Sequence, residues 1–251
     1  MDLGEHTLAQ QVNRYAVIIT SAINTKFGVY TSDERLAQTL ATIDSVRTRI
    51  PDCKIFLLEI SGVSLTATQA KVLTEQVDHL MDFTTDPDVV GLYNSTDNWD
   101  VVKNVTEVMC FGTAVKRLSQ DTGALADFQR VFKVSGRYTL DERFDIGFYD
   151  AYQNQHSMVI GTKQTSQFPF EVTQVEAQYM CRLWSWPTVL NAEVIAAYDN
   201  SLRYMYERLA AGGYADIEHC LYKFLDPAKV INRDVMGVVG NIAPNGAPIR
   251  N

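Results

Sequence analysis

The sequence lacks the recurrent signatures of several large enzyme classes. It contains no GxGxxG, P-loop, GxSxG or HExxH motif. Its four histidines are scattered, and no two of them stand at the spacing of metal ligands. These absences disfavour a zinc enzyme and a dinucleotide-dependent oxidoreductase.

Cysteine is scarce and dispersed. The four cysteines are Cys53, Cys110, Cys181 and Cys220, and no CxxC spacing occurs. A cysteine metal cluster or a redox pair is therefore not expected. In a reducing compartment, isolated cysteines behave as small buried hydrophobic residues.

Long apolar runs and blocks of like charge are also missing. The longest apolar stretches have strand length, and none approaches the roughly 20 residues that span a bilayer. Residues 1–14 are polar and lack the apolar centre of a secretion signal. The net charge of −8 disfavours bulk binding to nucleic acid. We expect a cytoplasmic protein without a transmembrane segment, and the oligomeric state stays open.

The pattern of apolar residues predicts an α/β fold. Residues 15–20 and 54–60 are near-continuous apolar runs, typical of strands buried on both faces of a parallel sheet. Capping-box spacings predict helices that begin near Thr31 and Thr66, the second reaching about residue 80. With a weak third strand at 81–85, the order β-α-β-α-β implies a parallel sheet with right-handed crossovers.

The rest of the chain is predicted to be mixed. We expect a loop over residues 86–100, because Pro87, Gly91 and two asparagines interrupt any regular spacing of apolar residues that would indicate a helix or strand. The later elements expected are a helix at 101–118, a strand at 129–140, strand-like segments at 157–162 and 177–183, helices at 192–211 and 217–225, and a loop-like tail at 235–251.

Polar residues follow the first two predicted strands. Thr20, Ser21 and Asn24 end the first strand, and Glu59 and Ser61 end the second. Ligands of open parallel sheets bind beyond the carboxyl ends of the strands. We therefore expect these residues at the mouth of a site.

Residues 133–138, with the sequence KVSGRY, form the most unusual segment. Gly136 permits close approach of a ligand or another backbone, and Arg137 is suited to clamping a diphosphate with two hydrogen bonds. Lys133 and Arg137 are four residues apart, so they share a face on a regular strand. The alternative is a bulge with two surface cations whose stems cover apolar residues.

Several acidic residues are candidates for chemistry. Glu218 lies near the start of a predicted helix, where it is either a general base or simply a complement to the helix dipole. Asp86 and Asp88 form a DxD tripeptide, which either binds a divalent ion beside a diphosphate or makes a turn. Asp141 and Asp145 are alternative acidic candidates.

Two further features have competing interpretations. Lys103 and Glu107 lie near the start of a helix, which suits either a phosphate site or a solvated helix face. Tyr179, Trp184 and Trp186 suit either a platform on which sugars stack or ordinary core packing.

Short motifs also occur in a characteristic order. They are IITSAI at 18–23, ERLAQT at 34–39, TIDS at 42–45, FKVSGRYTL at 132–140, DIEH at 216–219 and GNIAP at 240–244. This set resembles small glycosyltransferase-like proteins of phages, large viruses and bacteria, whose nucleotide-binding half belongs to a GT-A fold. The predicted β-α-β-α-β opening agrees with that resemblance.

The resemblance implies a single GT-A-like domain with a mostly parallel central sheet flanked by helices. Residues 12–120 would form the nucleotide-binding half, and residues 121–251 the acceptor half and tail. The implied reaction moves a sugar from a nucleotide-sugar donor to an acceptor hydroxyl, on a glycan or another molecule, with Glu218 as the base. The implied donor-binding residues are Thr20, Ser21, Arg35, Lys103, Lys133, Ser135, Gly136 and Arg137.

The sequence departs from the family pattern at the metal site. Many GT-A enzymes carry a metal-binding DxD where this chain reads Ser-Gly-Arg at 135–137. Either Arg137 replaces the metal, or Mn²⁺ or Mg²⁺ is held by carboxylates from elsewhere, namely Asp86 and Asp88 or Asp141.

Two other functions are compatible with the same features. The missing DxD suits a non-catalytic protein that binds carbohydrate or a partner on the same fold. A nucleotidyltransferase would share the sheet and the phosphate site.

Overall fold

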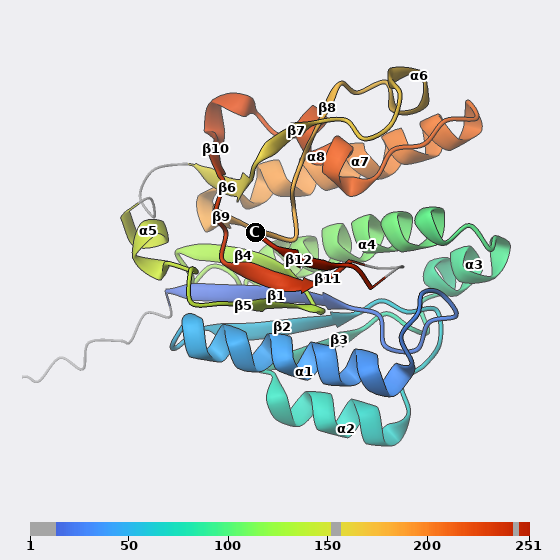
Figure 1. Ribbon diagram of the computed structural model, residues 1–251. Coiled ribbons are helices and arrows are strands. Elements are labelled where there is room, and N and C mark those ends of the chain that lie inside the picture. The colour runs from blue at the N-terminus through green and yellow to red at the C-terminus, as the bar shows by residue number, and fades with distance from the viewer. Residues whose placement is uncertain (1–13, 152–156, 243–245) are drawn as a thin grey trace, which may run out of the picture.

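A seven-stranded sheet forms the centre of the molecule (Figure 1). The computed structural model describes residues 14–151, 157–242 and 246–251. The strands lie in the order β10 (Val230–Arg233), β6 (Met158–Gly161), β9 (Leu183–Pro187), β4 (Arg130–Ser135), β1 (Tyr15–Ser21), β2 (Lys54–Glu59), β3 (His79–Asp82). Only β9 runs antiparallel to its neighbours in this sheet as the structure describes it. The predicted α/β fold with a mostly parallel sheet is confirmed.

Helices cover both faces of this sheet (Figure 1). On one face lie α1 (Ser32–Arg49) and α2 (Ala67–Gln76), and on the other lie α4 (Trp99–Lys116), α7 (Asn191–Ala210) and α8 (Ile217–Phe224). Ala16 and Ile18 of β1 pack in the core beneath α4 and α7, whereas Val17 and Ile19 pack in the core beneath α1. Successive side chains of a strand point to opposite faces, so an uninterrupted apolar run serves both cores.

The register of β1 places polar residues together at one edge. Thr20 lies opposite Ser135 of β4, and Ser21 lies opposite Glu59 of β2. All three strands run in the same direction, so their carboxyl ends meet there. The predicted site mouth is therefore built by neighbouring strands.

The capping boxes predicted for the first two helices are present. The side chain of Thr31 accepts from the backbone of Glu34, and that of Thr66 accepts from Gln69, each bond being returned to the cap residue. The predicted end of α2 near residue 80 is wrong, because the helix stops at Gln76 and β3 already begins at His79.

The cause of this early stop is pairing with the sheet. The Asp78 backbone N–H donates to Ile55 O at 3.1 Å. The Asp78 carboxylate in turn accepts from Ile55 N at 2.9 Å. These two bonds hold residue 78 against β2. The helix therefore ends at Gln76, although the helical spacing of apolar residues continues to about residue 80.

The loop predicted for residues 86–100 is also wrong in part. A helix, α3 (Pro87–Ser95), begins directly after Asp86. The Asp86 side chain accepts from the backbone N–H of Asp88 at 3.0 Å, which makes Asp86 an N-cap. Pro87 takes the first helical position, where its missing N–H costs nothing.

The single strand predicted for residues 129–140 is two strands in two sheets. After β4, the chain turns and enters β5 (Tyr138–Leu140). A second sheet contains β12 (Pro248–Arg250), β11 (Val238–Asn241) and β5, in that order. The tail predicted as a loop is thus largely a β-ribbon; residues 243–245 lie outside the described part of the chain.

The turn after β4 brings the chain close to β1. Gly136 N donates to Thr20 O at 2.7 Å, and Arg137 N donates to Ser135 O at 2.8 Å. A Cβ atom at Gly136 would lie 2.9 Å from Thr20 O. The expectation that Lys133 and Arg137 share a strand face is therefore wrong, because the strand ends between them.

The second half also differs in detail from the prediction. The segment expected as a strand at 177–183 is divided between two sheets, and β10 was not predicted. The remaining elements are a π-helical turn (Arg117–Asp121), α5 (Ile146–Ala151), β7 (Lys163–Thr165), α6 (Phe170–Thr173), β8 (Ala177–Tyr179) and 3-10 turns at Thr188–Leu190 and Pro227–Lys229.

Two predictions from composition can be compared with the structure. All four cysteines are free and buried, as expected of small hydrophobic residues. Among the helices of the described residues, none is long and apolar enough to cross a membrane.

Candidate functional site

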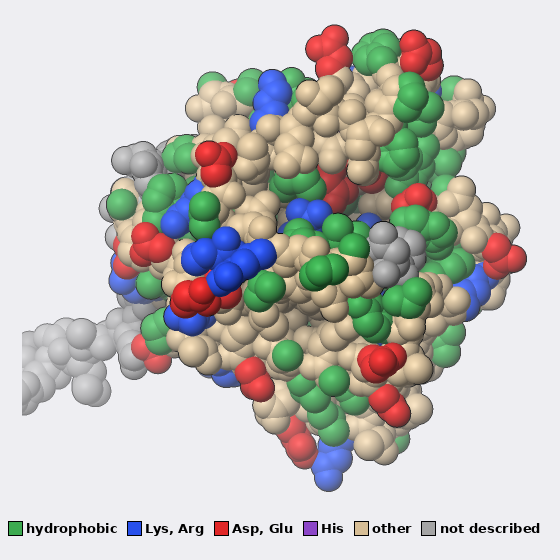
Figure 2. Space-filling view, in the orientation of Figure 1, with side chains coloured by type: hydrophobic (Ala, Val, Ile, Leu, Met, Phe, Trp, Pro, Cys, Tyr) green, Lys and Arg blue, Asp and Glu red, His purple; other side chains and the backbone are tan. Residues whose placement is uncertain are grey.

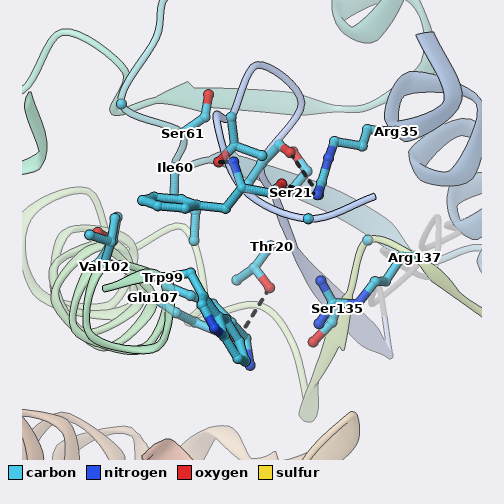
Figure 3. Close-up of a pocket in the computed structure, with 18 of the residues that line it drawn as sticks. Thr20, Ser21, Arg35, Ile60, Ser61, Trp99, Val102, Glu107, Ser135 and Arg137 are labelled. Carbon is cyan, nitrogen blue, oxygen red and sulfur yellow. Dashed lines mark hydrogen bonds between the residues drawn. The ribbon is translucent and has the colours of Figure 1, made fainter. Parts of the chain in front are cut away.

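A cavity of about 110 Å³ opens at the carboxyl ends of β1, β2 and β4; we call it the first cavity. All the predicted donor-binding residues except Lys133 line it. Figure 3 shows Arg35 and Arg137 on one side of the cavity, Val102 and Trp99 of α4 on the other, and Thr20 between them. The structure thus brings together residues that are distant in the sequence.

Glu59 organises the lip of the first cavity. This carboxylate is fully buried and accepts hydrogen bonds from Ser21 Oγ at 2.5 Å, from Ser61 Oγ at 2.6 Å and from Ile23 N at 2.9 Å. Burial raises the pKa of Glu59 above its ordinary value. Glu59 therefore fixes the loops after β1 and β2 to each other, a role that position in the sequence did not indicate.

Arg35 shapes the loop that follows β1. Its guanidinium donates to Phe27 O at 2.7 Å, and to Tyr30 O and Ala22 O at 3.4 Å each. Burial, and then the charge of Arg137, lower the pKa of Arg35. Arg35 thus holds backbone in place and also adds positive charge to the cavity.

A buried ion pair joins Glu107, which lines the first cavity, to Lys133 of β4. Lys133 Nζ is 2.5 Å from Glu107 Oε1 and donates to Ser135 Oγ at 2.8 Å, while Thr20 Oγ1 donates to Glu107 Oε1 at 3.3 Å. Burial alone would raise the pKa of Glu107, but the charges of Lys133, Lys103 and Arg137 and the hydrogen bond from Lys133 together outweigh burial and lower the pKa to about 2. Lys133 is 2% exposed. Its charge is committed to Glu107, so it is not a free ligand for phosphate.

A second cavity, of about 400 Å³, adjoins the first. The two share five lining residues, Trp99, Lys103, Glu107, Ser135 and Arg137. In Figure 2 a hollow divides the upper lobe from the body, and acidic and basic side chains lie close together inside it. The two cavities therefore form one cleft with two ends.

Glu218 lines the second cavity from the first turn of α8. The N-cap of this helix is Asp216, whose carboxylate accepts from His219 N at 3.0 Å. Burial, and then the charge of Asp216, raise the pKa of Glu218, while the charge of Lys103 opposes them. A carboxyl in a cavity with a raised pKa is typical of groups that exchange protons with a substrate.

A chain of three side chains fixes α8 beside this cavity. His219 Nδ1 lies 2.5 Å from Asp216 Oδ1, and His219 Nε2 lies 2.8 Å from Ser166 Oγ. His219 is fully buried, and Ser166 also donates to Phe168 O at 2.7 Å. The chain ties the loop at Phe168, which lines the second cavity, to the helix that carries Glu218. Ser166 gave no signal in the sequence, because its partners are distant along the chain.

Four cations of the cleft have no carboxylate within ion-pair distance among the described residues: Arg35, whose guanidinium is bonded to backbone carbonyls, and Lys103, Arg137 and Arg182. The guanidinium groups of Arg137 and Arg182 lie 5.4 and 5.8 Å from the ring centroid of Tyr138. Arg137 Nε is buried and has no hydrogen-bond partner within the part of the chain that the structure describes. These positive charges are available to a ligand.

The carboxylates proposed as metal ligands lie elsewhere. Asp86 caps α3, and Asp88 is exposed in its first turn. Asp141 is paired with Arg143 at 2.8 Å and with Arg250 at 3.0 Å. Asp86, Asp88 and Asp141 line neither cavity.

The residues of the cleft do not fit a divalent cation. Within the described ranges there is no group of three His, Cys, Asp or Glu side chains that could hold a metal ion. The turn after β4 offers a hydroxyl and a guanidinium instead of paired carboxylates.

The tryptophan cluster belongs to the core. Trp184 and Trp186 are fully buried, and their ring centroids are 4.6 Å apart. Tyr179 is also buried. The interpretation as a sugar platform is therefore wrong, and core packing explains these aromatics.

No protein-family model matches the sequence, and no curated protein matches it. Solved structures do show a likeness. An active-site mutant of LgtC gives a TM-score of 0.53 at 10% identity, over 86% of this chain and 72% of that chain. Mouse xyloside xylosyltransferase 1 in its apo form gives 0.52 at 9% identity, over 88% and 85%.

A third structure gives a lower score. The 4-diphosphocytidyl-2C-methyl-D-erythritol synthase of Anaerococcus prevotii gives a TM-score of 0.42 at 13% identity, over 95% of this chain and 91% of that chain. This score is too low to carry an argument. At such identities the likeness to LgtC and to the xylosyltransferase shows the fold alone. The chain has a GT-A-like fold.

Proposed function

We propose that this chain is a glycosyltransferase that moves a sugar from a nucleotide-sugar donor to an acceptor hydroxyl. The observation that carries the proposal is one cleft on a GT-A-like fold in which the unpaired cations Lys103 and Arg137 line both cavities and Glu218 lines the second. A nucleotide diphosphate requires positive charge, whereas an acceptor hydroxyl requires a base.

The donor fits the first cavity in this proposal. Thr20 and Ser21, at the end of β1, border the nucleotide, and Lys103 and Arg137 face its diphosphate. Ligands of open α/β sheets occupy this position because the carboxyl ends of the strands and the loops after them converge there.

The acceptor fits the second cavity. Its hydroxyl oxygen attacks the anomeric carbon of the sugar, the bond from that carbon to the diphosphate breaks, and Glu218 takes the hydroxyl proton. A base works best when its pKa lies near the operating pH. Burial and the neighbouring charge of Asp216 raise the pKa of Glu218 in that direction.

The test combines binding with turnover. A thermal-shift screen of uridine, guanosine, cytidine and adenosine diphosphate sugars identifies the donor, because a ligand of the native state raises the apparent stability. Release of nucleoside diphosphate with and without candidate acceptors then measures hydrolysis and transfer. Absence of binding to every nucleotide and nucleotide sugar would refute the proposal.

The same assays separate the two alternative functions. A nucleotidyltransferase would release pyrophosphate from a nucleoside triphosphate. A non-catalytic carbohydrate-binding protein would bind a glycan and turn over no donor at all.

A further inference from the structure

The turn after β4 presents a cation at the position where a metal would be expected on this fold. Residues 135–137 contribute a hydroxyl and a guanidinium, and no carboxylate. The buried carboxylates near the turn are already engaged. Glu107 is paired with Lys133, and Glu59 accepts from Ser21 and from other donors of the lip. Neither has a free oxygen pair to offer a divalent ion.

Arg137 has the features of a residue that awaits an anion. It lines both cavities, and its Nε is buried without a hydrogen-bond partner among the described residues. Buried polar groups in native proteins are nearly always satisfied, so an unsatisfied one that lines a cavity is open to a water, an ion or a ligand. A guanidinium presents its donors in a planar fork that matches two oxygens of a phosphate.

The position of Arg137 is fixed by the backbone. Gly136 N donates to Thr20 O, and the Gly136 backbone passes so close to β1 that a Cβ would lie 2.9 Å from that oxygen. The Gly136 carbonyl accepts from Thr39 Oγ1 of α1 at 3.1 Å. The turn is therefore attached to β1 and to α1, and it directs the next side chain into the cleft.

A second guanidinium stands beside the first. Arg35 lines the first cavity, and the charge of Arg137 contributes to lowering its pKa. Two like charges in a partly buried cavity repel each other, and an anion bound between them removes that repulsion. Lys103 lines the same cavity from α4 and adds a third positive charge.

We propose that Arg35, Lys103 and Arg137 together replace a divalent cation at the diphosphate, so that the chain binds its nucleotide without a metal. This inference rests on the proposed function and specifies how the donor is held. In transfer, the electron pair of the broken bond stays on the diphosphate oxygen. Arg137 and Lys103 stabilise that developing charge by hydrogen bonds and by their own charge.

The first experiment measures binding as a function of metal. Protein dialysed against EDTA is titrated by calorimetry with uridine, guanosine, cytidine and adenosine diphosphates, and the titrations are repeated with Mn²⁺ and with Mg²⁺. We expect one diphosphate to bind in EDTA, with a Kd that either metal changes by less than about threefold.

The second experiment uses two matched variants. Arg137→Ala removes the proposed ligand, and we expect the metal-free Kd to rise about 10- to 100-fold, the range for a charged hydrogen bond. Arg203→Ala is the control, because it removes an exposed guanidinium of α7 that lines neither cavity. We expect its Kd to stay near that of the parent chain. Thermal melting of both variants verifies that they fold.

The outcomes separate this inference from the proposed function. Binding that appears only with Mn²⁺ or Mg²⁺ would overturn the inference and leave a metal-dependent transferase. An unchanged metal-free Kd in Arg137→Ala, or an equal loss in Arg203→Ala, would also overturn it. If no diphosphate binds under any condition, the proposed function fails, and the inference fails with it. Tight metal-free binding that depends on Arg137 supports both.

Discussion

The two ends of the cleft differ in their carboxylates: Asp100, Asp216 and Glu218 line only the second cavity, whereas the cations Lys103 and Arg137 line both. In the first cavity the unpaired groups are Arg137 and Lys103, beside the guanidinium of Arg35. In the second cavity Glu218 lies next to Asp216, and the neighbouring negative charge raises its pKa. One end is therefore suited to an anion, and the other to a group that gives up a proton.

The ion pair between the two ends has no net charge. Glu107 and Lys133 neutralise each other beneath the cleft, at a distance of 2.5 Å. A buried charge is therefore not by itself evidence of a functional residue. The charges that can bind a ligand are those without a partner inside the protein, and Glu107 and Lys133 are not among them.

The largest expected effect tests the acidic end. Glu218→Gln removes the proposed base, and we expect the rate of transfer to fall by about 10²- to 10⁴-fold, the usual contribution of a general base. Nucleotide affinity should stay unchanged, because the first cavity is intact. Steady-state kinetics and calorimetry measure the two quantities. Glu75→Gln, an exposed residue of α2, is the control, and an equal loss of rate there would contradict the assignment.

The next effect concerns the buried pair and is one of stability. Glu107→Gln leaves Lys133 buried without a counter-charge, and we expect a loss of about 3–5 kcal/mol in the free energy of unfolding. The double variant Glu107→Gln, Lys133→Met should recover part of it. Urea denaturation measures both, and a single variant as stable as the parent chain would show that the pair contributes little.

The pH dependence of stability follows from the same pair. The pKa of Glu107 is lowered from 4.5 to about 2 in the folded chain. Its contribution is therefore complete above pH 4.5 and is lost as the pH falls through about 2. In Glu107→Gln the free energy of unfolding should therefore fall less steeply between pH 4.5 and about 2 than in the parent chain. The same pH dependence in both chains would argue against the ion pair between Glu107 and Lys133.

A smaller effect is expected at the turn that positions Arg137. Gly136→Ala brings a Cβ to 2.9 Å from Thr20 O, so the backbone must shift. We expect a loss of about 1–3 kcal/mol in stability, as for other overpacked sites, together with weaker diphosphate binding. Gly91→Ala is the matched control, because nothing lies within 4 Å of its added Cβ. Thermal melting and calorimetry distinguish the two variants.

The smallest effect concerns the pH profile of transfer. Glu218 acts as a carboxylate, so kcat/KM should rise with pH through its raised pKa. Asp216→Asn removes one cause of that rise in pKa, and we expect the acid limb of the kcat/KM profile to move to lower pH. Asparagine remains able to cap α8. A limb that stays in place would show that Asp216 does not influence the base.

The sequence predicted those parts of the fold that depend on local patterns. The capping boxes at Thr31 and Thr66 and the apolar run of β1 each require only neighbouring residues, and all three are present. Asp86 was ambiguous, because the side-chain-to-backbone bond that starts a turn also caps a helix. The β5–β11 pairing could not be predicted, because its two strands are distant along the chain.

The candidate site was predictable in the same measure. Residues at the ends of the first two strands, such as Thr20 and Glu59, followed from the topology that the sequence indicated. The pairing of Lys133 with Glu107 did not, since it depends on how α4 packs against β4. Whether a charge is free or paired is a property of the packed structure, so the sequence could not show it.

The change of sheet at Gly136 has a consequence for the whole C-terminal region. Because β4 belongs to the central sheet and β5 to the small sheet with β11 and β12, the turn that carries Arg137 is anchored on both sides. Any displacement of the small sheet relative to the central one would strain this turn. A substitution in β11 or β12 that shifts the small sheet would therefore also move β5 and the turn before it, and with that turn the side chain of Arg137.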